Sequence, residues 1–184
     1  MDYLYASGMA FGPLPVDLNG RGITMTIDVG DRVPSANLKE IGADGLGDVP
    51  TDDLFKGRKV AVFGLPGAFT PTCSAKHLPG FVENAGALKA KGVDEIVCVS
   101  VNDAFVMKAW SDQQGAAGKV RLLADGNAEL AKAMGLALDA SGYGMGTRSQ
   151  RFSMVVEDSV VKAVAIDPPG SFKDTSAETM LGQL

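Results

Sequence analysis

Short apolar runs alternate with amphipathic stretches along most of the chain. A short apolar run between charged residues or glycines predicts a buried strand, and apolar residues three or four positions apart predict a helix. The predicted strands are 59–65, 95–101, 120–124, 151–156 and 160–166, and the predicted helices are 72–90, 104–114, 127–134 and 176–184. The last two strands flank Glu157-Asp158-Ser159, which indicates a hairpin. Strand–helix alternation ending in a hairpin predicts an α/β domain with a mixed sheet.

The first 24 residues follow a different pattern, because glycine and proline interrupt them and no periodicity is sustained. We predict a poorly ordered N-terminal extension over 1–24, with Met25 as a candidate natural start, and a single domain over 25–184. An extra strand packed on the core is the alternative for the extension. A length of 184 residues fits one domain, or at most two small ones.

Composition and charge exclude several classes of protein. An apolar content of 46% and a charged content of 21% are typical of a globular domain, and a formal charge of −5 disfavours general binding to nucleic acid or to anionic membranes. Two cysteines and one histidine are too few for a disulfide framework or a four-ligand zinc site, so we expect no metal and no cofactor. Without an apolar run of membrane-spanning length or a secretory signal, we expect a soluble protein in a reducing compartment, the cytoplasm.

Residues 64–73, Gly-Leu-Pro-Gly-Ala-Phe-Thr-Pro-Thr-Cys, carry the strongest chemical signal. They follow a buried strand and open a helix, with Thr70 at the N-cap and Pro71 at the first helical position. Cys73 then lies in the first turn, where unpaired N–H groups and the helix dipole favour a reactive thiolate. An inert buried cysteine beside an ordinary helix cap is the alternative that this local pattern leaves open.

The segment Pro66-Gly-Ala-Phe-Thr70-Pro-Thr-Cys73 resembles the Pro-x-x-x-Thr-x-x-Cys motif of the peroxiredoxins. The blocks 74–82, 100–105, 120–125 and 151–155 are similar to the type II, peroxiredoxin-five-like subfamily, and the similarity runs from about residue 25 to 184. It implies a thioredoxin-like fold, with a mixed central sheet flanked by helices. It also implies an enzyme that reduces hydrogen peroxide and organic hydroperoxides with thiols.

The resemblance assigns roles to four residues. Cys73 attacks the O–O bond and becomes a sulfenic acid. Arg151 stabilises the thiolate and the charge that develops on the departing oxygen. Thr70 offers its hydroxyl to the sulfur and the peroxide, Pro66 shapes and shields the pocket, and the backbone N–H groups of Thr72 and Cys73 are candidate donors. The closeness of Arg151 to Cys73 is implied by the family and not by spacing.

His77 and Pro79 lie on the same predicted helix as Cys73. His77 stands one turn after Cys73, which suggests a Cys–His dyad, but we favour a packed or hydrogen-bonded histidine beside Phe81. Pro79 removes a helical hydrogen bond to Ala75 and is expected to kink the helix.

Cys98 lies in the middle of a predicted strand, where an apolar core role is the simplest interpretation. A resolving role, in which Cys98 attacks the sulfenic acid, is the alternative and requires local unfolding. Some type II relatives carry a resolving cysteine near the C-terminus, but residues 172–179 contain none. We therefore expect an external thiol to recycle the enzyme: glutathione with glutaredoxin, or thioredoxin.

The family commonly dimerises near the site, so we expect a homodimer, with Phe105, Trp110 and the loop 142–147 as candidate contacts. The glycines of that loop lack the spacing of a dinucleotide-binding motif. Two other functions stay open: a thioredoxin-like disulfide oxidoreductase, disfavoured because Thr70 stands where the first cysteine of C-x-x-C would be, and a non-catalytic redox sensor or chaperone-like binder.

Overall fold

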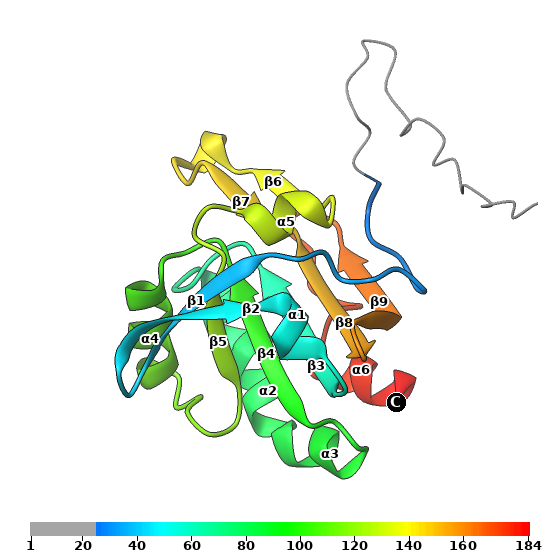
Figure 1. Ribbon diagram of the computed structural model, residues 1–184. Coiled ribbons are helices and arrows are strands. Elements are labelled where there is room, and N and C mark those ends of the chain that lie inside the picture. The colour runs from blue at the N-terminus through cyan, green and yellow to red at the C-terminus, as the bar shows by residue number, and fades with distance from the viewer. Residues whose placement is uncertain (1–24) are drawn as a thin grey trace, which may run out of the picture.

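The computed structural model describes residues 25–184, and the prediction for residues 1–24 lies outside this range. A mixed seven-stranded sheet in the order β2-β1-β5-β4-β3-β8-β9 forms the centre, and β6 and β7 form a separate two-stranded sheet (Figure 1). The strands are β1 (Asn37–Gly42), β2 (Gly45–Pro50), β3 (Lys59–Leu65), β4 (Glu95–Ser100), β5 (Arg121–Ala124), β6 (Ala137–Asp139), β7 (Thr147–Ser149), β8 (Arg151–Glu157) and β9 (Val160–Asp167). The strands β3, β4 and β5 are parallel, while β8 runs antiparallel to β3 and β9 antiparallel to β8.

Alternating side chains of the central strands build two apolar cores, one on each face of the sheet. On β3, Ala61, Phe63 and Leu65 join one core, whereas Val60 and Val62 join the other. This period of two explains why the strand reads as an unbroken apolar run, since both of its faces are covered.

Helices cover both faces (Figure 1). The core that contains Phe63 is covered by α2 (Leu78–Glu83), α3 (Ala85–Ala90), α4 (Ala104–Gln113) and α6 (Ala177–Gln183), and the opposite core by α1 (Thr51–Phe55) and α5 (Glu129–Ala133). No helix within residues 25–184 is long and apolar enough to cross a membrane.

The predicted strands and most predicted helices are confirmed, but the single helix over 72–90 is wrong. That stretch consists of the π-helical turn η1 (Cys73–His77), then α2, then a break at Asn84 before α3. The β1–β2 hairpin, α1 and the β6–β7 pair were not predicted. Only one residue of β1 and one of β2 are buried, so their sequences carry almost no apolar periodicity.

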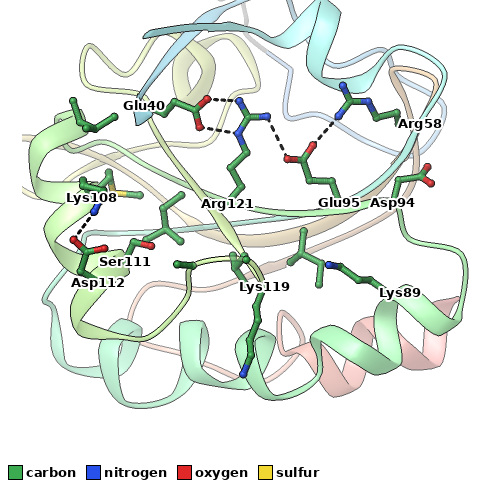
Figure 2. Close-up of a pocket in the computed structure, with 17 residues that line it drawn as sticks. Glu40, Arg58, Lys89, Asp94, Glu95, Lys108, Ser111, Asp112, Lys119 and Arg121 are labelled. Carbon is green, nitrogen blue, oxygen red and sulfur yellow. Dashed lines mark hydrogen bonds and ion pairs between the residues drawn. The ribbon is translucent and has the colours of Figure 1, made fainter. Parts of the chain in front are cut away.

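Arg121 connects three strands through ion pairs at the edge of the sheet where β4 and β5 begin (Figure 2). Its Nε donates to Glu40 of β1 at 2.8 Å and its Nη1 to Glu95 of β4 at 3.2 Å, and Arg58 contacts the other oxygen of Glu95 at 2.9 Å. These side chains line a groove of about 520 Å³. The groove contains none of the predicted site residues. It lies where β4 and β5 begin, whereas the segment that leads to Cys73 follows Leu65, at the opposite, carboxyl end of the parallel strands.

Gly64 is required by close packing between β3 and β8. A Cβ atom at this position would lie 2.0 Å from the ring of Phe152, which is buried. We expect Gly64→Ala to lower the free energy of unfolding by about 1–3 kcal/mol, because the ring must leave its packed position. Urea unfolding would measure this. Gly80→Ala is the control, since a Cβ there meets no atom within 4 Å; equal stability of Gly64→Ala and the wild type would contradict this account of the packing.

Candidate active site

The loop over 66–70 leaves the carboxyl end of β3 and is held by Asn102, which follows the neighbouring strand β4. The N–H of Ala68 donates to the side-chain oxygen of Asn102 at 3.0 Å, and Ser100 donates to the same oxygen at 2.7 Å. Phe69 adopts a left-handed backbone with φ of +62° and is half exposed. Such strain in a residue that is not glycine persists only where the surrounding structure enforces it, and it is frequent at functional sites.

Thr70 begins the helix that carries Cys73. Its carbonyl accepts a hydrogen bond from the N–H of Ser74 at 3.0 Å, and helical structure starts at Pro71, as predicted. Its hydroxyl donates to the carbonyl of Gly67 at 2.8 Å. The hydroxyl proton is thus directed at the loop and not at the sulfur, which leaves the Thr70 oxygen as an acceptor for an O–H group.

Cys73 and Arg151 meet although they are 78 residues apart in the sequence. The Nη2 atom of Arg151 donates to the sulfur of Cys73 at 3.6 Å, and both side chains are buried, with exposed fractions of 7% and 1% respectively. Arg151 is the first residue of β8, and β8 pairs with β3, so the sheet brings the arginine to the end of the strand that precedes the cysteine. A permanent positive charge with rigid N–H donors therefore lies beside the sulfur, in a position shielded from water.

His77 forms a hydrogen bond with Arg151 and not with the cysteine. Its Nδ1 lies 2.9 Å from Nη1 of Arg151, and its Nε2 lies 3.0 Å from the carbonyl of Thr175. Because a carbonyl only accepts, the proton is on Nε2, and Nδ1 is the acceptor for the guanidinium. Both ring nitrogens are therefore used, which argues against a Cys–His dyad and supports the hydrogen-bonded histidine, packed beside Phe81 at 5.7 Å between centroids.

The electrostatics of His77 agree with this neutral state. Burial, and secondarily the charge of Arg151, lowers the pKa of His77 from 6.5 to about 3. The imidazole consequently stays neutral through the physiological range and remains an acceptor for Arg151.

Ser171 and Phe172, in the loop that follows β9, complete the environment of Arg151. The Nε atom of Arg151 donates to the carbonyl of Ser171 at 3.2 Å, and its guanidinium carbon lies 5.6 Å from the centre of the Phe172 ring. The contacts of Ser171, Phe172 and Asn102 were not predicted, and neither was Arg151 as the hydrogen-bond partner of His77. The only sequence signal for the first two is an aromatic residue within an otherwise polar segment.

The helix geometry around Cys73 follows from Pro79. The N–H of Leu78 bonds to the carbonyl of Cys73, a wider helical turn than in an α-helix, and regular helix resumes at Leu78 with proline in its first turn. A π-helical turn thus stands directly before Leu78 and Pro79, and the kink expected at Pro79 stays a prediction. Trp110 fixes the turn from the side, because its indole N–H donates to the hydroxyl of Ser74 at 3.0 Å.

Trp110 is fully buried, which corrects its proposed role as a dimer contact. A large aromatic ring with a satisfied N–H belongs to the core. Phe105 of α4 is 68% exposed, and Tyr143 of the loop 142–147 is 85% exposed. Phe105 and this loop therefore stay predicted dimer contacts.

Cys98 is a fully buried thiol in the middle of β4. It lies between Phe63 of β3 and Leu122 of β5 in the strand register, and it forms no disulfide with Cys73. Burial, and secondarily the proximity of Cys73, raises the pKa of the Cys98 thiol well above its usual range. Cys98 is therefore protonated and a poor nucleophile in this fold.

Comparisons with known proteins point mainly to one family. The profile of the family described as Redoxin matches residues 28–181. The chain is 51% identical over 167 residues to Peroxiredoxin-2E-2, chloroplastic, of Oryza sativa subsp. japonica (88% of this chain, 74% of that protein). It is 45% identical over 159 residues to Peroxiredoxin-2B of Arabidopsis thaliana (86% and 98%). The crystal structure of reduced Prx3 in complex with hydrogen peroxide from Vibrio vulnificus is 48% identical with a TM-score of 0.82, covering 85% of this chain and 98% of that chain.

Proposed function

Because this chain belongs to the peroxiredoxin family, has its thioredoxin-like fold and is a thiol-dependent peroxidase, we propose that Cys73 is the sulfur that attacks the peroxide. The observation that carries this assignment is the 3.6 Å contact between Cys73 and Arg151 in a site shielded from water. A buried guanidinium beside a thiol at a helix start is the arrangement that nucleophilic sulfur chemistry requires.

The proposed reaction starts with the Cys73 thiolate. Its sulfur forms a bond to the terminal oxygen of the hydroperoxide while the O–O bond breaks, so that sulfur is oxidised to a sulfenic acid and the peroxide is reduced. The departing oxygen carries the electron pair of the broken bond and takes up a proton, leaving as water or as an alcohol. One thiol then displaces the sulfenic oxygen as water to form a mixed disulfide, and a second thiol releases reduced Cys73.

We assign three supporting roles in this step. Arg151 stabilises the thiolate and the charge that grows on the departing oxygen. The Thr70 oxygen, whose own proton goes to Gly67, accepts the O–H of the bound peroxide and orients it. To Pro66, half-buried and without an N–H, we assign the shaping and shielding of the space beside the sulfur.

We propose that an external thiol recycles Cys73, by glutathione with glutaredoxin or by thioredoxin. The support is the condition of Cys98, which is buried, protonated and held in the central sheet. Neither reductant is favoured over the other by a contact in residues 25–184, so turnover must be compared with each.

Cys98→Ser is expected to retain peroxide turnover with both reductants, within about twofold of the wild type, because this thiol takes no part in the proposed cycle. Peroxide consumption under excess reductant would measure it, with Cys73→Ser as the inactive reference. Loss of turnover in Cys98→Ser with normal formation of the sulfenic acid would instead make Cys98 the resolving thiol. Oxidation of the wild type without turnover under any reductant would favour the sensor.

We further propose a homodimer and a cytoplasmic location. The exposed Phe105 and Tyr143 support an association surface, and a chain with only two cysteines has no disulfide framework of the kind that secreted proteins carry. Sedimentation of the wild type and of Phe105→Ser would test the dimer. Microscopy of a fluorescent fusion would test the location, since one rice relative is named chloroplastic.

A further inference from the structure

A single carboxylate organises the connection between β9 and α6. Asp167, the last residue of β9, has an exposed fraction of 1%. It accepts hydrogen bonds from the N–H groups of Lys173 and Asp174, both at 3.0 Å, and from the hydroxyl of Thr175 at 2.7 Å. Three donors from consecutive residues converge on one side chain, so the loop 168–176 is closed back onto the end of β9.

The same loop supplies the partners that surround the arginine of the active site. The carbonyl of Ser171 accepts from Arg151, and the Phe172 ring lies against both Arg151 and His77. The carbonyl of Thr175 accepts from His77, which in turn accepts from Arg151. All of these contacts except the His77–Arg151 bond are made by loop residues, so they depend on where the loop lies.

Asp167 also stands opposite Arg151 in the β8–β9 pair. The carboxylate that closes the loop is therefore fixed to the strand register that carries the arginine. Asp167 fixes the loop backbone, and the loop carbonyls of Ser171 and Thr175 in turn hold Arg151 and His77. These contacts link Asp167 to the guanidinium that faces the sulfur of Cys73.

We propose that Asp167 is a positioning residue of the peroxidase: by closing the loop 168–176 it holds His77 and Arg151 in the orientation that directs Nη2 at Cys73. The proposal rests on the function assigned above to Cys73 and Arg151. Asp167 touches no reacting atom, and it acts through the loop. Without it the carbonyls of Ser171 and Thr175 lose their fixed positions, and Arg151 loses the partners that restrict its rotation.

Asp167→Asn is the variant that isolates this effect. Asparagine keeps the shape of aspartate, but it replaces one acceptor oxygen with a donor NH₂ group, which cannot bind the donors that converge there. The loop closure is weakened without a change in side-chain volume.

The chain contains a single histidine, so ¹⁵N-labelled imidazole signals report on His77 alone when no histidine tag is attached. In the wild type we expect one tautomer, with the proton on Nε2. In Asp167→Asn we expect a mixture of tautomers, and a rate constant for Cys73 oxidation by hydrogen peroxide that is about tenfold lower. Unchanged His77 signals with an unchanged rate would overturn the proposal.

Asp125→Asn is the matched control. Asp125 is also buried, and it accepts the N–H groups of Leu130 and Ala131 at the start of α5. We expect that substitution to lower stability while leaving the His77 tautomer and the oxidation rate as in the wild type. Equal changes in both variants would reduce the role of Asp167 to general stability and overturn the proposal.

If Asp167→Asn does not fold, Thr175→Val decides the question. It removes the hydroxyl that donates to Asp167 and keeps the carbonyl that accepts from His77. The expected result is the same change in tautomer with a rate about threefold lower, and wild-type behaviour would overturn the proposal. The imidazole signals do not depend on peroxide, so they test the loop closure by themselves. A wild-type Cys73 that failed to react with peroxide would instead remove the proposed function.

Discussion

Arg151→Met is expected to slow the oxidation of Cys73 by hydrogen peroxide about 100- to 1,000-fold. The substitution removes the charge 3.6 Å from the sulfur and the donor available to the departing oxygen, while methionine retains much of the apolar stem. The transition state would lose the stabilisation of the charge that grows on the departing oxygen. Rapid mixing with peroxide, followed by mass spectrometry of Cys73, would measure the rate constant.

Arg151→Lys separates charge from geometry. Lysine keeps a positive charge, but it cannot donate at once to Cys73, His77 and Ser171, as the guanidinium does. We expect an intermediate rate, between those of the wild type and Arg151→Met. A rate for Arg151→Met equal to that of the wild type would remove Arg151 from the mechanism.

The stability of the fold is expected to fall as the pH decreases from about 6.5. The folded state holds His77 neutral with a pKa lowered to about 3, first by burial and then by the charge of Arg151. In the unfolded chain the imidazole takes up a proton near pH 6.5, so the unfolded state binds more protons throughout this interval. From this group alone the free energy of unfolding should therefore decrease, with a slope that approaches about 1.4 kcal/mol per pH unit once the pH is well below 6.5.

His77→Gln isolates that contribution from the carboxylates, which titrate at lower pH. Glutamine does not titrate and presents both an acceptor and a donor. The difference in free energy of unfolding between the wild type and His77→Gln, measured by denaturant titration from pH 7 to 4.5, should change with the expected slope. A constant difference over this interval would show that His77 takes up its proton equally in both states.

Much of the central sheet could be predicted from the sequence, because its strands are buried on both faces and appear as short apolar runs. The start of the Cys73 helix could also be predicted, since Thr70 and Pro71 mark a helix start through local chemistry. The hairpin of β1 and β2 could not: Leu38 and Val49 are its buried residues, and long-range pairing determines the rest.

The arrangement around Cys73 was predicted only in part for a related reason. The proximity of Arg151 came from the resemblance to a family, since no spacing rule brings together residues 78 positions apart. The bond between His77 and Arg151 depends on the register of β8 against β3 and on the carbonyl of Thr175. Backbone carbonyls are contributed by every residue type, so a loop that acts through them leaves no signature in the sequence.

The central claim is that peroxide is reduced at Cys73, and Trp110 offers the most direct measurement. It is the only tryptophan of the chain, and its indole N–H bonds to Ser74, the neighbour of Cys73. After rapid mixing with hydrogen peroxide we predict a single fluorescence change whose rate is proportional to peroxide concentration, together with one added oxygen on Cys73 by mass spectrometry. The change should persist in Cys98→Ser and vanish in Cys73→Ser. The same change in Cys73→Ser, or an added oxygen on Cys98, would contradict the account.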